Sequence, residues 1–140
     1  MTLTTIASLI GTIIAVTAFV VGIWQYRRSV NIEIFRTYAD KYNEIITAEN
    51  YDNWQAALAG EKDFWAELTP TMIKYLNLIW EEFYLYDSGI MPPYLWRLWL
   101  PEIKNTLATE FAIETIDKYE FHSTYAAFLG IAHINVKFPC

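Results

Sequence analysis

The feature that most constrains this chain is an uninterrupted apolar run close to its first residue. Residues 3–24 read LTTIASLIGTIIAVTAFVVGIW and contain no charged side chain. As a helix, this run is about 33 Å long, which is enough to cross a hydrocarbon core of about 30 Å. Because its apolar side chains cover every face, it differs from the amphipathic helix of a soluble domain. The sequence therefore predicts a transmembrane segment over residues 1–26.

A cleaved signal peptide is the alternative interpretation of the same run. Signal peptides begin with a basic region, have a shorter apolar core and end at a site of the Ala-x-Ala type. Here no basic residue precedes the run, the run is longer than such a core, and no Ala-x-Ala sequence occurs before Arg27. We therefore expect a span that is retained.

Basic residues on one side of the span predict its orientation. Arg27 and Arg28 follow the apolar run directly, and no Lys or Arg precedes it. The positive-inside rule then places the N-terminus outside and residues 27–140 in the cytoplasm, with the span in the inner (cytoplasmic) membrane. Trp24 and Tyr26 occupy the membrane interface, where aromatic side chains are enriched.

Small residues recur at intervals of four along the predicted span. They are Ala7, Gly11 and Ala15, followed by Ala18 and Gly22. Small side chains at this spacing allow two helices to approach closely in a bilayer. The sequence therefore suggests a contact with a second copy of the span or with another membrane subunit, and the alternative is that these residues simply face lipid.

The remainder of the chain predicts an all-α cytoplasmic domain over residues 27–140. No Gly or Pro interrupts residues 25–58, so the span helix is expected to continue as an amphipathic stalk over residues 27–48. An irregular bundle of about four or five helices should follow. Its helices are expected near residues 52–59 with an end at Gly60, from Thr69-Pro70 to an end at Ser88-Gly89, from Pro92-Pro93 onward, over residues 101–119 and over residues 123–136.

Charge and cysteine content exclude some functions of this domain. The formal net charge is -6, and the chain has no cluster of Lys and Arg that would offset nucleic-acid phosphates. Nucleic acid is therefore not an expected partner. The single cysteine, Cys140, cannot form an internal disulfide, which agrees with a cytoplasmic location.

No pattern of catalytic, cofactor-binding or metal-binding residues appears in the chain. His122 and His133 would lie about 16 Å apart on one helix, which is too far for a shared metal ion. The three glycines outside the span, Gly60, Gly89 and Gly130, are isolated, so no phosphate-binding loop is present. We therefore predict that the protein is not an enzyme and carries no cofactor.

The most conspicuous polar pair is Glu81-Glu82. Adjacent residues on a helix do not converge on one point, so we expect one carboxylate in solvent. The other would form an ion pair with Arg97 or take part in binding. The nearby aromatic residues Tyr94, Trp96 and Trp99 allow three interpretations, namely core packing, a ligand platform or a membrane-interface belt.

Several short motifs resemble a large group of small bacterial single-span membrane proteins of unknown function. The span ends in Trp24-Gln25-Tyr26-Arg27-Arg28, and Ile79-Trp80-Glu81-Glu82-Phe83 follows in the domain. The turn Asp87-Ser88-Gly89-Ile90 and the sequence Trp99-Leu100-Pro101-Glu102-Ile103 complete the likeness. The resemblance covers most of the chain, although Pro92-Pro93 departs from the pattern. It implies a single span and a cytosolic helical domain, and it implies no activity.

These observations favour a membrane-anchored, non-enzymatic protein that acts through protein contacts. Its partners would be the lipid bilayer and either other membrane subunits or itself, as an accessory subunit of a complex or a small homo-oligomer. The alternative is a membrane effector of a stress or phage-defence system, whose soluble domain senses a ligand.

Overall fold

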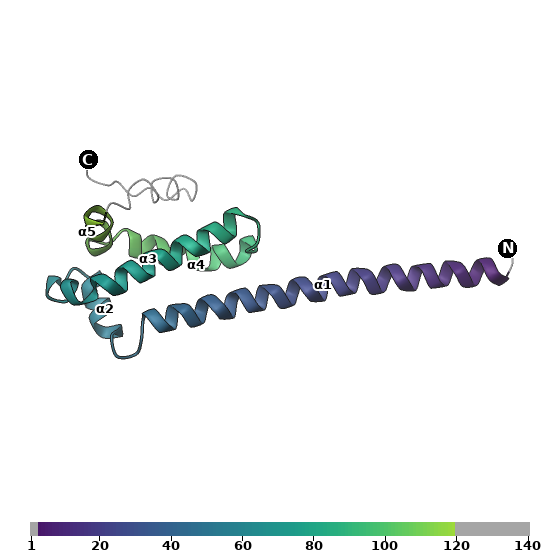
Figure 1. The fold of residues 1–140 in the computed structure, drawn as a ribbon, viewed down its shortest axis with the longest axis horizontal. Helices are drawn as coiled ribbons and strands as arrows, with labels where there is room; N and C mark the ends of the chain where they lie inside the picture. The colour runs from purple at the N-terminus through teal and green to yellow at the C-terminus, as the bar shows by residue number, and fades with distance from the viewer. Residues whose placement is uncertain (1–2, 120–140) are drawn as a thin grey trace. The chain divides into compact units, whose positions relative to one another are not determined.

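The computed structural model describes residues 3–119, and all regular structure within them is helical (Figure 1). This confirms the all-α class and the long apolar helix at the N-terminal end. The predicted helix over residues 123–136 lies outside the described residues, as do His122, His133 and Cys140. The described elements are α1 (Leu3–Ile45), α2 (Tyr51–Leu58), the 3-10 turn η1 (Lys62–Phe64), α3 (Trp65–Asp87), α4 (Pro93–Leu107) and α5 (Glu110–Lys118).

Helix α1 runs without a break for 43 residues, so the predicted continuation beyond the apolar run is confirmed. It ends at Ile45, earlier than the end at residue 48 that the sequence suggested. The side-chain amide of Asn50 donates a hydrogen bond of 3.1 Å to the carbonyl of Ile45. This bond satisfies a carbonyl of the last turn that has no partner within the helix.

The described chain divides into two compact units, and the division falls within the predicted stalk, between Arg36 and Thr37. In the first unit, every residue from 10 to 29 is exposed. The large side chains Ile14 and Phe19 are 63% and 70% exposed. By length and composition, this helix could cross a membrane, and a signal sequence has the same properties.

The second unit is a helical bundle organised around α3, which contacts α2, η1, α4 and α5. Helix α3 is buried along one face because Met72, Leu76 and Ile79 follow helical spacing. Aromatic rings fill much of the interior. The largest fully buried side chains are Trp54, Met72, Leu76, Ile79, Met91, Leu107, Phe111 and Ile116.

Two glycines end helices as the sequence predicted. Gly60 follows α2 with φ of +102°, and Gly89 follows α3 with φ of +71°. A residue with a side chain is strained at these angles, whereas glycine adopts them freely. These two turns separate the helices of the bundle.

The predicted start of α3 at Thr69-Pro70 is wrong. Helix α3 begins at Trp65, directly after η1, and Pro70 lies inside it. The Thr69 hydroxyl donates a hydrogen bond of 2.6 Å to the Trp65 carbonyl and does not cap the helix. Proline is tolerated here because Pro70 and Ala66, whose carbonyl loses its partner, are both exposed and open to water.

The single helix predicted over residues 101–119 is also wrong. Helix α4 passes through Pro101 and ends at Leu107, and a separate helix α5 begins at Glu110. The break lies at Thr109, which caps the start of α5. Its hydroxyl oxygen accepts a hydrogen bond of 3.3 Å from the Ala112 amide, and its hydroxyl proton is donated to the Thr106 carbonyl at 2.7 Å. The proline is accommodated because Arg97, four residues before it, is exposed.

Candidate functional site

The last turns of α1 provide the first group of interacting polar side chains. Lys41 forms an ion pair with Glu81 of α3, and the Tyr38 hydroxyl donates a longer bond of 3.5 Å to the same carboxylate. The Tyr42 hydroxyl donates a bond of 3.0 Å to Glu102 of α4. Three side chains of α1 therefore bind carboxylates on two different helices of the bundle.

Aromatic contacts reinforce this attachment. The Tyr38 and Trp99 rings lie 6.1 Å apart, and the Tyr42 ring meets Tyr75 edge-on at 6.1 Å. Burial raises the pKa of both the Tyr38 and Tyr42 hydroxyls, and for Tyr42 the neighbouring Glu102 adds to the effect. Both hydroxyls therefore stay protonated at neutral pH and remain donors.

Glu82 lies beside this group and is in a different environment from Glu81. It is 7% exposed, and no group within residues 3–119 hydrogen-bonds to its carboxyl. Burial, followed by the charges of Glu102 and Glu81, raises the pKa of Glu82 to about 8. The carboxyl is therefore largely protonated at neutral pH, and its ionisation just above neutrality places a charge in the interior.

The ion pair suggested by the sequence has a different partner from the one expected. Glu81 is paired with Lys41 and not with Arg97. Arg97 lies on the exposed face of α4, and its Nε donates a hydrogen bond of 3.3 Å to the carbonyl of Pro93 in its own helix. Lys41, and not Arg97, pairs with Glu81 because the end of α1 packs against α3.

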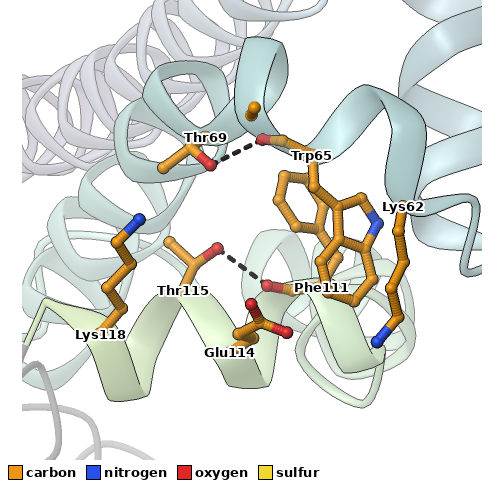
Figure 2. Close-up of a pocket in the computed structure, with 8 residues that line it drawn as sticks. Lys62, Trp65, Thr69, Phe111, Glu114, Thr115 and Lys118 are labelled. Carbon is orange, nitrogen blue, oxygen red and sulfur yellow. Dashed lines mark hydrogen bonds between the residues drawn. The ribbon is translucent and has the colours of Figure 1, made fainter.

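A pocket of about 320 Å³ forms the second candidate site, on another part of the bundle. It lies between the start of α3 and helix α5, and its volume is near the lower limit of the range typical of ligand-binding pockets. In Figure 2, Thr69, Thr115 and Lys118 border one side of the opening, and Trp65 and Phe111 border the other. Its lining comprises Lys62, Trp65, Ala66, Thr69, Phe111, Glu114, Thr115 and Lys118.

The walls of this pocket combine an apolar surface with charges. The Trp65 and Phe111 rings stack at 5.3 Å between centroids, and the Lys62 ammonium lies 4.7 Å from the centre of the Trp65 ring. Lys62 is also bonded to Glu110 at 2.8 Å, and that bond raises its pKa. Glu114 and Lys118 line the pocket without an ion pair to each other among the described residues.

The residues predicted as a helix–helix contact all lie on α1. Gly11, Ala15, Ala18 and Gly22 are exposed, and a methyl group added at Gly11 or Gly22 would meet no atom within 4 Å. The exposure of Ala7 is not described. The predicted contact with another helix therefore stays a prediction.

The predicted interface residues are also on α1. Trp24 and Tyr26 are exposed, and the Arg28 guanidinium lies 5.6 Å from the centre of the Trp24 ring. Arg27 is likewise exposed. Their aromatic and basic side chains have the composition of a membrane interface, and this assignment stays a prediction.

The aromatic residues of α4 divide between core and surface. Trp96 is buried and stacks on Tyr86 at 5.1 Å, whereas Tyr94 is 54% exposed. Trp99 packs against Tyr38 of α1. Core packing therefore accounts for two of these three residues, and they do not gather into one platform.

No cluster of three or more His, Cys, Asp or Glu suitable for a metal ion occurs within residues 3–119. Comparison with family models, with curated proteins and with solved structures finds no match for this chain. The resemblance to small bacterial single-span proteins therefore depends on the short motifs quoted above.

Proposed function

We propose that the protein is a single-span membrane protein of the inner membrane, with a cytoplasmic domain that acts through protein contacts. In this proposal it is an accessory subunit of a membrane complex or a small homo-oligomer, and it is not an enzyme. The observation that carries the proposal is the exposed apolar surface of α1, which water would solvate poorly and a bilayer would cover.

The small-residue face of α1 supports the contact with another helix. At Gly11 and Gly22, open space surrounds the backbone, so a neighbouring helix could approach closely. The buried carboxyl Glu82 does not line the pocket between α3 and α5.

Replacing both Gly11 and Gly22 with leucine should weaken assembly, because the new side chains hold the helices apart. We expect the dissociation constant of the complex to rise at least about tenfold, which corresponds to about 1.4 kcal/mol. Sedimentation of the full chain in mild detergent measures this change. It should show a shift toward the monomer.

A matched control places bulk on the opposite face of the same helix. Ile13 and Val20 lie about half a turn away from the glycines, so Ile13→Phe with Val20→Phe should leave assembly unchanged. An assembly of unchanged size in the glycine variant would count against α1 as the contact surface.

The pocket favours a second candidate function, that of a membrane effector in a stress or phage-defence system. Such a protein needs a ligand site in its soluble domain, and the pocket between α3 and α5 has a suitable size. Its small volume favours a compact ligand over a nucleotide.

Overexpression tests this second candidate. The full chain should then arrest growth and depolarise the inner membrane, and a variant without residues 1–26 should do neither. Normal growth and membrane potential at high levels of the full chain would remove the effector function from consideration.

A further inference from the structure

We infer that the pocket between α3 and α5 binds a small zwitterion, specifically an α-amino acid with an apolar side chain. The inference concerns the soluble domain alone and does not depend on whether α1 spans a membrane. It starts from the two charged side chains of α5 that line the pocket, Glu114 and Lys118.

These two charges are neighbours on one helix and yet are not bonded to each other. Side chains four residues apart project from the same face of a helix, with about 5–6 Å between their Cβ atoms. Within residues 3–119, neither Glu114 nor Lys118 forms an ion pair, and the Lys118 ammonium only approaches the Tyr119 ring at 5.6 Å. In Figure 2 the Lys118 ammonium and the Glu114 carboxylate lie on either side of Thr115, so a cationic and an anionic group flank the same part of the pocket, as the two ends of an amino acid require.

Two threonines add acceptors for an ammonium group. Thr69 donates its hydroxyl proton to the Trp65 carbonyl at 2.6 Å, and Thr115 donates its own to the Phe111 carbonyl at 2.8 Å. Since both protons are engaged, the two hydroxyl oxygens offer only lone pairs to a ligand. Figure 2 shows both threonines between Lys118 and the rings of Trp65 and Phe111.

The cationic side of the pocket depends mainly on Lys118. Lys62 already binds Glu110 at 2.8 Å, so much of its charge is compensated. Lys118 is the cation that remains for a ligand carboxylate, and Glu114 with the two threonine oxygens remains for a ligand ammonium. A simple anion would contact only Lys118, and a simple amine would contact only Glu114 and the threonine oxygens.

The opposite wall determines the character of the ligand side chain. Trp65 and Phe111 are stacked and buried, and Ala66 lies beside them in the lining. These groups present an apolar surface that a polar or charged side chain would not match. The volume of about 320 Å³ accommodates an amino acid.

Calorimetric titration of the full chain in detergent with L-phenylalanine tests the inference. A ligand of this size in an open pocket should bind with a Kd of about 1 mM. Two analogues separate the contributions of the charges. We expect 3-phenylpropanoate, which lacks the ammonium, and 2-phenylethylamine, which lacks the carboxylate, each to bind at least about tenfold more weakly.

Two conservative variants locate the site. Lys118→Gln and Glu114→Gln change exposed side chains, so the fold should persist, and each should weaken L-phenylalanine binding at least about tenfold. Lys74→Gln removes an exposed lysine of α3 that does not line the pocket and should change nothing. Absence of binding up to about 20 mM, equal binding of 3-phenylpropanoate, or unchanged binding in both α5 variants would each overturn the inference.

Discussion

Glutamine in place of Glu82 should make the domain more stable at pH 9 and leave its stability at pH 5 nearly unchanged. At pH 9 the native carboxyl is ionised inside the bundle, where no hydrogen bond within residues 3–119 compensates the charge. The neutral amide has almost the same shape and removes that charge. We expect a gain of about 3 kcal/mol or more at pH 9, or about 10 °C or more in Tm.

The direction of this effect follows from the two pKa values of Glu82. The carboxyl has a pKa of 4.5 in its ordinary state and about 8 in the folded domain, so the folded state holds the proton more tightly. The stabilisation is complete below pH 4.5 and is lost as the pH rises through about 8. Thermal unfolding of the full chain in detergent, followed by near-ultraviolet circular dichroism from pH 5 to pH 9, measures it.

Glu81→Gln provides the matched control for this experiment. Glu81 is the adjacent residue, its side chain is 51% exposed, and its pair with Lys41 lies at the surface. Exposed ion pairs contribute up to about 1 kcal/mol. Because burial, and not the charge of Glu81, is the largest cause of the raised Glu82 pKa, this variant should keep most of the pH dependence of the wild type. An equally steep decline of stability between pH 5 and pH 9 in Glu82→Gln would show that the buried carboxyl does not cause it.

Truncating Trp54 to alanine should destabilise the bundle by about 3–5 kcal/mol. Trp54 is 2% exposed, and its ring lies 5.5 Å from that of Tyr75 on α3 and 6.4 Å from that of Phe111 on α5. The side chain therefore joins three helices, and its removal leaves a cavity that the rigid neighbours fill poorly. Urea unfolding of the full chain in detergent, followed by near-ultraviolet circular dichroism, gives the change in free energy.

Tyr51→Ala controls for the loss of an aromatic residue from the same helix. Tyr51 is 49% exposed at the start of α2, so its truncation should cost less than about 1 kcal/mol. If Trp54→Ala and Tyr51→Ala differed by less than about 1 kcal/mol, Trp54 could not be the residue that joins the three helices.

The helix boundaries that could be predicted from the sequence are those that a single local feature determines. The uncharged run with no later Gly or Pro predicted the continuous helix α1, and Gly60 and Gly89 predicted the ends of α2 and α3. The predicted helix starts were wrong at two prolines. Pro70 and Pro101 each predict a helix start, whereas each lies on an exposed side of a helix where water can solvate the carbonyl that the proline frees.

The candidate sites were only partly predictable. The pair Glu81-Glu82 is conspicuous in the sequence, but the different environments of the two residues depend on which side of α3 packs against the end of α1, and this is a tertiary property. The spacing of Glu114 and Lys118 was visible in the sequence. The sequence did not show that these two residues line a pocket, because the pocket forms only when α5 packs beside Trp65.

The unbroken passage of α1 from one compact unit into the other has a consequence for how the domain folds. A helix is costly to nucleate and cheap to extend, and an isolated helix shorter than about 12–15 residues is marginal in water. Residues 37–45 are fewer than that, but they continue the helix of residues 3–36 without a break. Once that helix has formed, these residues need only propagation, and Tyr38 and Tyr42 can be displayed without a separate nucleation step.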